Sequence, residues 1–223
     1  MVIPIRLRLS NAYLVKGERP ILVDTGSPGE TDRIVQALHA EGVAPGDLAL
    51  ILHTHGHYDH CGSSAALRKQ SGAPTAIHPA DAPLMASGRT RDLKATRRSA
   101  ALLAPLMNQT FDALQADLLV GPDTDLRPYG VAGRLLHTPG HTHGSLTLLL
   151  DSGEAIVGDL LMGGHLGGVI SPQQPRYHYF ADDIGLVRTH IGTVVRAAKG
   201  RVYVGHGGPL ELDAIRTSFQ SIL

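Results

Sequence analysis

The feature that most constrains this chain is the stretch ILHTHGHYDHCG, residues 51–62, because polar, metal-binding residue types follow an apolar run without a break. The run at 48–52 has the length and continuity of a buried strand. The stretch behind it contains four histidines and one aspartate: His53, His55, His57, Asp59 and His60. Such a stretch is either a histidine-rich surface loop or part of a metal site.

Three further polar clusters also follow predicted strands and help to separate these alternatives. They are TPGHTHGS at 138–145, VGDLL at 157–161 and VGHGG at 204–208. Loops at strand ends build the sites of α/β proteins, so clusters far apart in sequence can meet in space. Four clusters in such positions favour a metal site over a solvated loop.

The spacing within the first cluster suits two neighbouring metal ions. His55 and His57 are two residues apart, and on an extended backbone such side chains point the same way and can reach one metal. Asp59 and His60 are consecutive and diverge, which suits a second metal.

The other clusters complete the set of donors. His141 and His206 each stand beside a glycine, which lets the backbone approach a crowded centre. Asp159 offers two carboxylate oxygens and can bridge two cations. Five histidines and two aspartates are enough for two divalent ions, and nitrogen and oxygen ligands without thiolate suit zinc, manganese or iron.

Length and charge restrict the class of protein. A chain of 223 residues is most simply one domain, 1–223, with its own core. Lys and Arg number 20, as do Asp and Glu, so we expect no nucleic-acid partner and a small-molecule substrate instead. No signal peptide or membrane-spanning run is visible, so we expect a cytoplasmic protein without a membrane partner. The oligomeric state stays open, a homodimer included.

Strands and helices alternate along the chain, with one exception. Residues 79–118 contain three prolines and apolar residues at helical spacing, at 93, 100 and 103 and at 111, 114 and 118, which predict a helical insertion. Residues 158–168 are expected to form a glycine-rich loop. Two sheets packed face to face with helices outside fit the pattern. Periodicity leaves a doubly wound sheet equally open.

The motif H-x-H-x-D-H at 55–60, followed in order by His141, Asp159 and His206, resembles the metallo-β-lactamase superfamily. The resemblance runs from LVDTG at 22–26 to GHGGP at 205–209. It implies an α/β (α+β) fold, an αββα sandwich with metals at one edge. It also implies a distribution of ligands: His55, His57 and His141 on one metal, Asp59, His60 and His206 on the other, Asp159 between them, and Asp24 orienting the ligands.

A hydrolase of a small ester, lactone or thioester is the leading hypothesis. Two divalent ions, zinc first with iron or manganese as alternatives, would share a hydroxide that attacks the carbonyl. Asp59 would accept the proton and pass it to the leaving group. We expect substrate contacts from His165, His178 and Tyr177, which lie in segments that flank the metals.

Departures from the family pattern argue against some of the activities known in the superfamily but do not identify the substrate. Asp159 stands where one group of β-lactamases has a cysteine, and Met162 stands where certain lactonases have a tyrosine. One alternative is an iron oxygenase resembling persulfide dioxygenases. Its single iron would be bound by His55, by either His57 or His141, and by Asp159. Another is a metal-binding protein without turnover.

Overall fold

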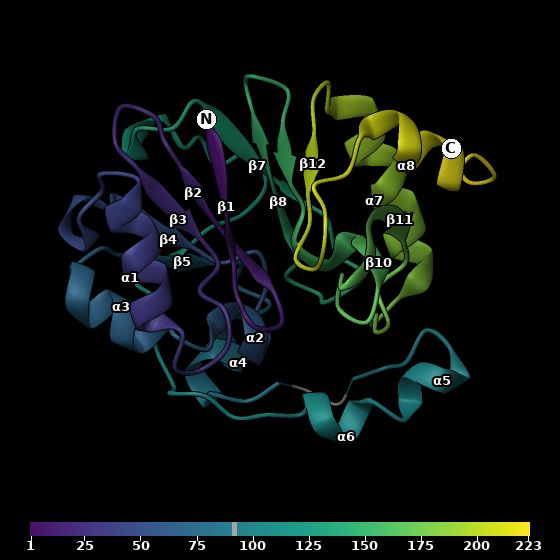
Figure 1. Cartoon of the computed structure of the whole chain (residues 1–223), viewed down its shortest axis with the longest axis horizontal. Helices are drawn as coiled ribbons and strands as arrows, with labels where there is room; N and C mark the ends of the chain where they lie inside the picture. The colour runs from purple at the N-terminus through teal and green to yellow at the C-terminus, as the bar shows by residue number, and fades with distance from the viewer. Residues whose placement is uncertain (91–92) are drawn as a thin grey trace.

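Two β-sheets pack face to face and carry helices on their outer faces (Figure 1). The structure, a computed structural model, describes residues 1–90 and 93–223. The first sheet has the strand order β1-β2-β3-β4-β5-β6 and the second has the order β12-β9-β8-β7, while β10 and β11 form a separate pair. The expected two-sheet sandwich is therefore confirmed, and the doubly wound alternative is wrong.

The strands are β1 (Val2–Arg6), β2 (Asn11–Val15), β3 (Ile21–Val23), β4 (Leu50–Leu52), β5 (Thr75–Ile77), β6 (Leu118–Leu119), β7 (Gly133–His137), β8 (Leu146–Leu150), β9 (Ala155–Ile156), β10 (Met162–His165), β11 (Ile170–Arg176) and β12 (Val202–Tyr203). The α-helices are α1 (Thr31–Ala40), α2 (Tyr58–Cys61), α3 (Ser64–Ser71), α4 (Ala82–Ser87), α5 (Arg98–Ala101), α6 (Ala104–Met107), α7 (Ile184–Ala197) and α8 (Leu212–Ser218). Short 3-10 helices lie at Pro45–Asp47, Arg127–Tyr129 and Gly158–Leu160.

Side chains of the central strands alternate between two apolar layers. Leu50 and Leu52 of β4 face the second sheet, whereas Ile51 between them faces the helices. In the second sheet, Ile156 of β9 joins the core between the sheets and Ala155 faces the helix side. Because both faces of these strands are buried, their sequences are unbroken apolar runs. Periodicity alone therefore did not distinguish the sandwich from a doubly wound sheet.

Helices close both outer layers. On the first sheet, α1 contributes Ile34 and Leu38, and α3 contributes Leu67. On the second sheet, α7 and α8 pack through Ile191 and Ile215, among others. No helix in the described part of the chain is long and apolar enough to cross a membrane.

Strand direction determines where the polar clusters lie. Strands β3, β4 and β5 are parallel, so the loops after them leave from the same edge of the first sheet. In the second sheet, β12 and β9 are parallel, and β7 has the same direction because it reaches β9 through two antiparallel pairings. The loops that carry the metal-binding residue types therefore emerge together.

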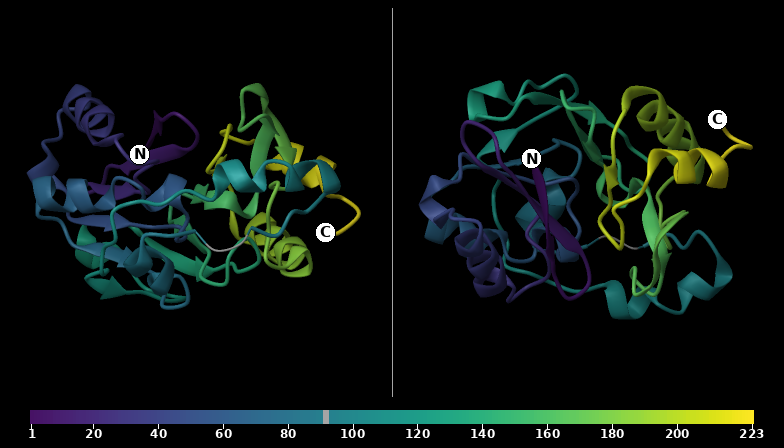
Figure 2. Two further views of the ribbon diagram at one scale, coloured as in Figure 1. Left: turned by 90° about the horizontal axis from the view of Figure 1, so that it is seen from below. Right: turned by 45° about the horizontal axis from the view of Figure 1, so that its top comes forward.

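Residues 79–118 cross this edge and are less helical than the spacing predicts (Figures 1 and 2). Its helices among the described residues are α4, α5 and α6 alone, and residues 91–92 lie outside the described part. No helix is present at 111–118, because the nitrogens of Phe111 and Leu114 donate to the carbonyls of Gly88 and Met85 around the end of α4. Further along, the nitrogen of Thr96 donates to Tyr179, which joins this segment to the chain after β11.

The glycine-rich stretch at 158–168 is not the loop that we expected. It contains β10, which pairs antiparallel with β11. A Cβ at Gly163 would lie 1.8 Å from the carbonyl oxygen of Pro172, so this glycine permits close approach of two strands. The prolines of β11 hid the strand in the sequence, since proline is unusual in a sheet.

Candidate metal centre

All seven side chains expected to bind metal converge at the edge where the strand-end loops meet. They are His55, His57, Asp59, His60, His141, Asp159 and His206, and each is less than 10% exposed. They come from the loops after β4, β7, β9 and β12 and from the short helix α2. His178, which follows β11, joins them.

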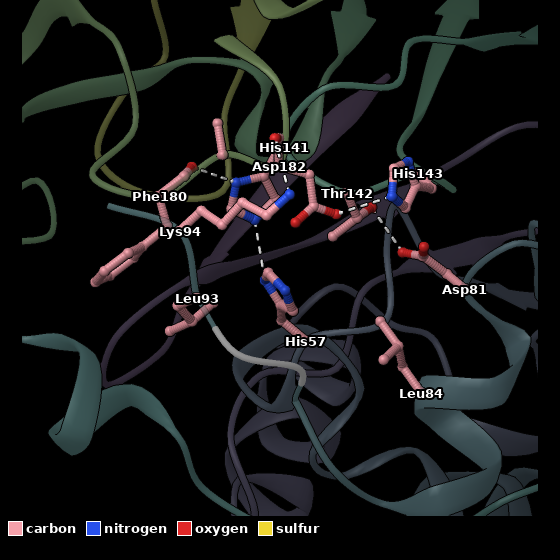
Figure 3. Close-up of a pocket in the computed structure, with 11 residues that line it drawn as sticks. His57, Asp81, Leu84, Leu93, Lys94, His141, Thr142, His143, Phe180 and Asp182 are labelled. Carbon is pink, nitrogen blue, oxygen red and sulfur yellow. Dashed lines mark hydrogen bonds and ion pairs between the residues drawn. The ribbon is translucent and has the colours of Figure 1, made fainter. Parts of the chain in front are cut away.

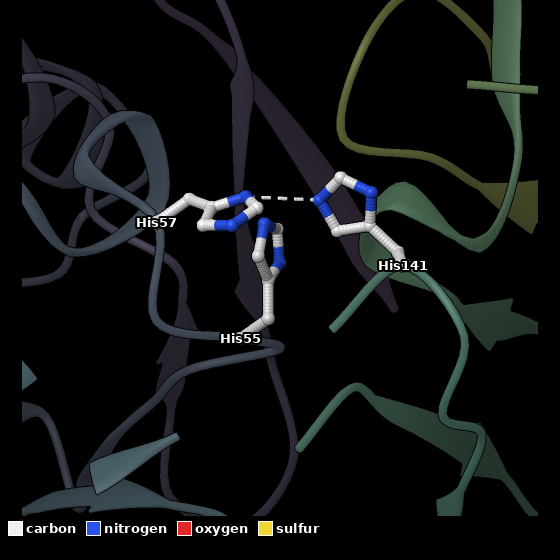
Figure 4. Close-up of side chains that lie close together, drawn as sticks. All are labelled: His55, His57 and His141. Atoms are coloured by element: carbon white, nitrogen blue, oxygen red, sulfur yellow. Dashed lines mark hydrogen bonds between the residues drawn. The ribbon is translucent and has the colours of Figure 1, made fainter. Parts of the chain in front are cut away.

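The first group is formed by His55, His57 and His141 (Figure 4). His57 Nδ1 lies 3.0 Å from His141 Nε2. The ring of His55 lies edge-on to both others, with centroids 4.8 Å from His57 and 4.6 Å from His141. Three ring nitrogens thus point at one small volume.

The second group is formed by Asp59, His60 and His206. Asp59 Oδ2 lies 3.5 Å from His206 Nε2. Helix α2 places Asp59 and His60 on successive positions of one turn, and the loop after β12 brings His206 to them.

Asp159 lies between the two groups. Its Oδ2 is 3.4 Å from His141 Nε2 and 3.3 Å from His206 Nε2. Its Oδ1 is 3.5 Å from His60 Nε2. One carboxylate therefore faces donors of both groups, which is the position of a ligand that two cations can share.

Asp24 orients two of the histidines from behind. Its Oδ2 accepts a hydrogen bond from His60 Nδ1 at 2.8 Å and another from Thr54 Oγ1 at 2.7 Å. Because the hydroxyl proton of Thr54 is used on Asp24, the Thr54 oxygen accepts from His55 Nδ1, 3.1 Å away. In the neutral form that binds metal, both histidines then carry their proton on Nδ1, and the lone pair of each Nε2 faces the centre.

Backbone carbonyls orient two other histidines by accepting hydrogen bonds from their Nδ1 atoms. His141 Nδ1 donates to the Phe180 oxygen at 2.9 Å, and His206 Nδ1 donates to the Leu9 oxygen at 2.7 Å. In the neutral rings their Nε2 atoms are therefore also unprotonated and point inward.

Four of the inward-facing atoms have no hydrogen-bond partner among the described residues. They are His55 Nε2, His60 Nε2, Asp159 Oδ1 and His206 Nε2, and all are buried. Buried polar atoms of a native protein are almost always satisfied. All four are electron-pair donors, so cations satisfy them, and the donor set fits a pair of divalent ions.

The protonation states fit metal binding as well. Burial lowers the pKa of His57 and of His141 to about 3, so both are neutral near pH 7. Burial alone would raise the pKa of Asp159, but the neighbouring His206 and His178 outweigh it and hold this pKa well below its usual range. Neutral imidazoles and an ionised carboxylate are the forms that bind metals.

Asp81 is part of the site although the sequence did not indicate it (Figure 3). Its carboxylate accepts from the Gly56 nitrogen at 2.9 Å, from Thr142 Oγ1 at 2.7 Å and from the Gly144 nitrogen at 2.8 Å. It thereby ties the loop of His55 and His57 to the loop of His141. No motif marks this residue, because its partners are two backbone nitrogens and a hydroxyl from distant loops.

The three expected substrate contacts have different surroundings. His178 lies inside the cluster, with Nε2 3.4 Å from Asp159 Oδ2. Tyr177 packs its ring on Phe219 at 4.8 Å, away from the cluster. His165 lies on β10, and its side chain makes none of the contacts that join the cluster within the described residues.

An apolar cavity of about 220 Å³ opens beside the cluster. His178 and His206 form its polar end. The other lining residues include Leu9, Leu103, Met107, Met162 and Leu166. Leu103 and Met107 come from the 79–118 segment, so that segment forms part of the cavity wall.

Comparisons with known proteins agree with this geometry. Residues 5–206 match the metallo-beta-lactamase superfamily. The chain is 25% identical over 202 residues to a probable metallo-hydrolase of Methanocaldococcus jannaschii, covering 89% of this chain and 87% of that one. It is 31% identical over 166 residues to an N-acyl homoserine lactonase of a Bacillus species, covering 63% of this chain and 57% of that one.

Among solved structures, a similar one is TTHA1623 in a di-iron-bound form. The TM-score is 0.70 at 25% identity, with 99% of this chain and 100% of that chain covered. With a match over nearly the whole chain, the two-sheet sandwich and the histidine–aspartate cluster at its edge, the protein belongs to the metallo-beta-lactamase superfamily.

Proposed function

We propose that this protein is a metal-dependent hydrolase with two divalent ions. His55, His57 and His141 would hold one ion, Asp59, His60 and His206 the other, and Asp159 would contact both. The observation that supports this most strongly is the buried Asp159 carboxylate, which faces unpartnered nitrogens of both groups. Zinc remains our first choice, while the di-iron form of TTHA1623 supports iron as the alternative.

Two bound divalent ions would lower the pKa of a coordinated water and polarise a substrate carbonyl. The chain's own contribution is to fix the donors before substrate arrives. Asp24, Thr54 and two backbone carbonyls hold four ring lone pairs inward. Such preorganisation limits the rearrangement needed when charge develops on the substrate.

Two residues are placed to handle protons. Asp59 is buried at the edge of the second group, and we propose that its carboxylate accepts a proton and passes it to the leaving group. His178 Nδ1 lies 3.1 Å from the Phe180 oxygen and 3.2 Å from the Phe180 nitrogen. Either tautomer of His178 therefore keeps a partner, so its Nε2 can hold or release a proton beside Asp159.

The apolar cavity supports a substrate with an uncharged, apolar substituent next to the scissile carbonyl. Esters, lactones and thioesters all provide a carbonyl that is electrophilic without further activation. The lactonase relative supports lactones within this set.

The mononuclear alternative agrees less well with the contacts. An iron held by His55, His57 or His141, and Asp159 would leave His60 Nε2 and His206 Nε2 as buried, unpartnered atoms. Two ions would give each of these buried nitrogens a metal to bind. Measuring oxygen uptake with iron-loaded protein and a persulfide separates this reaction from hydrolysis.

The test is hydrolysis of a panel of esters, lactones and thioesters by protein reconstituted with zinc or iron. We expect turnover of at least one class, and His57→Ala should reduce kcat at least a hundredfold while circular dichroism stays unchanged. Turnover unchanged in His57→Ala would contradict the proposal. Full metal loading without turnover of any class would favour the metal-binding protein without activity.

A further inference from the structure

Three arginines line a second cavity, of about 350 Å³. Arg97 precedes α5, Arg176 ends β11, and Arg188 lies on α7. The remaining lining residues are Thr96, Met162, Pro175, Tyr177, Tyr179, Ile184, Ser218 and Phe219. Among the described residues, the lining contains no carboxylate to balance the three positive charges.

Within residues 1–90 and 93–223, these three arginines lack the carboxylate partners that some other arginines of the chain have. Five other arginines are paired with carboxylates: Arg68, Arg127, Arg134, Arg201 and Arg216. Within the described part of the chain, none of the three cavity arginines has an ion-pair partner. Arg176 Nη2 donates to Gln174 at 2.9 Å, but its Nε is buried and has no hydrogen-bond partner among the described residues.

Aromatic rings support two of the three guanidinium groups. Arg97 lies over the ring of Tyr179, 4.5 Å from its centroid, and Arg188 lies 5.8 Å from the centroid of Tyr177. Such contacts with the ring face hold a cation in place without neutralising it. The charges remain available to a ligand.

The arginine-lined cavity is adjacent to the apolar cavity of the candidate active site. Met162 and Tyr179 line both cavities. The apolar cavity in turn reaches His178 and His206. The cationic cavity therefore lies next to the apolar cavity that reaches the metal cluster, with Met162 and Tyr179 between them.

We infer that the substrate carries an oxyanion at the end remote from the scissile bond and that Arg97, Arg176 and Arg188 bind it. This inference deepens the proposed hydrolase function. Guanidinium groups match the oxygens of phosphates and carboxylates, and three of them suit a group with more than one negative charge. Phosphate or diphosphate is therefore bound more tightly than a single carboxylate.

Matched thioesters test the inference kinetically. Hexanoyl-coenzyme A and hexanoyl-N-acetylcysteamine share the acyl group and the thioester but differ in the phosphorylated part. We expect KM to be about tenfold lower for the coenzyme A thioester, the scale of three partly exposed ion pairs, with similar kcat.

The triple variant Arg97→Gln, Arg176→Gln, Arg188→Gln should abolish this preference. The control is Arg196→Gln, which removes an exposed charge from the same helix α7 but lies outside the cavity lining. If the triple variant does not fold, Arg188→Gln alone serves, since this residue is exposed. Equal KM values for the charged and neutral thioesters in the native protein overturn the inference.

A binding measurement separates this inference from the proposed function. Calorimetry with pyrophosphate is performed on chelator-treated native protein, on the triple variant and on Arg196→Gln, so that no metal ion binds the anion in place of the arginines. We expect the triple variant alone to lose most of the affinity, whether or not any thioester is hydrolysed. Unchanged pyrophosphate binding in the triple variant overturns the inference even if hydrolysis is observed.

Discussion

At the scale of single residues, each candidate ligand depends on the group behind it. Asp24 has a φ of 60°, which is uncommon for a residue other than glycine, and its carboxylate accepts from Thr54 and His60 in that conformation. The strained backbone is held by these hydrogen bonds, which in turn fix the histidine tautomers. A substitution behind the ligands is therefore as informative as one among them.

Asp24→Asn should weaken the second metal site. The amide oxygen can still accept from the backbone nitrogen of Thr54, but the amide nitrogen then replaces the oxygen that faces His60 Nδ1 and favours the tautomer protonated on Nε2. That tautomer has no lone pair for a metal, so we expect metal affinity to fall about 10- to 100-fold. Competition with a fluorescent chelator measures it, and an affinity equal to that of the native protein would refute the orienting role.

Gly205→Ala should disrupt the centre without touching a ligand. A Cβ at this position would lie 2.0 Å from Asp159 Oδ1 and 2.7 Å from His60 Cε1. We expect a marked loss of bound metal with secondary structure retained, as seen by elemental analysis and circular dichroism. Gly46→Ala is the control, because a Cβ there meets no atom within 4 Å. Full metal content in Gly205→Ala would contradict the packing described.

The candidate ligands could be located from the sequence because histidine and aspartate are conspicuous at the ends of apolar runs. Asp81 could not, since an aspartate before a helix is common and its partners become neighbours only on folding. His165 and His178 were equally plausible in sequence. Packing alone brings His178 to Asp159 and leaves His165 outside the cluster.

At the scale of elements, strands with two buried faces were easier to predict than the pieces that cover the site. Strand β4 lies within the apolar run at 48–52, where a buried strand was expected. The 79–118 segment departs from its helical spacing because hydrogen bonds to α4 replace helical ones. The β10–β11 pair was missed because its glycines and prolines serve close contacts between strands, which sequence patterns do not reveal.

The 79–118 segment should control substrate preference through its apolar side chains. Changing Leu103 and Met107 to serine removes apolar surface from the cavity wall. We expect KM for substrates with a long apolar substituent to rise about tenfold, with metal content unchanged. Leu102→Ser is the control, because Leu102 is 81% exposed and does not line the cavity. Equal effects of the two changes would exclude this segment from substrate binding.

At the scale of the whole molecule, the fold has its own apolar cores and the metal cluster lies at its edge. One core fills the space between the sheets, and one lies under the helices on each side. A chain of this size buries enough apolar surface to fold without metal as a staple. The metal-free protein is therefore accessible to measurement, and its stability should depend on pH.

Acid should destabilise the metal-free protein well before its carboxylates titrate. Burial lowers the pKa of His57 and His141 to about 3 and that of His53 to about 4, against 6.5 in the unfolded chain. Between these values the unfolded chain binds more protons, so stability falls as the pH falls below 6.5.

Two other groups act in the opposite direction and offset part of this loss between pH 7 and 6. Burial lowers the pKa of His60 and His206, but Asp159 outweighs it, so both have a raised pKa. The stability from these two is fully present below pH 6.5 and is lost only as the pH rises. Urea unfolding of chelator-treated protein at pH 7, 6 and 5 measures the effect, and we expect the midpoint to decrease most between pH 6 and 5. A constant midpoint would mean that these histidines are not buried as neutral groups.

The most direct test of the dinuclear centre is calorimetric metal titration of the native protein beside Asp159→Asn. The amide keeps the shape of the carboxylate but loses its charge and one ligating oxygen. We predict two equivalents of metal for the native protein. In the variant, the three-histidine site should be retained, the second site should bind more weakly, and the pH–rate profile should shift toward alkaline pH. Two sites of native affinity in Asp159→Asn, with an unshifted profile, would remove Asp159 from the metal centre and contradict the dinuclear mechanism.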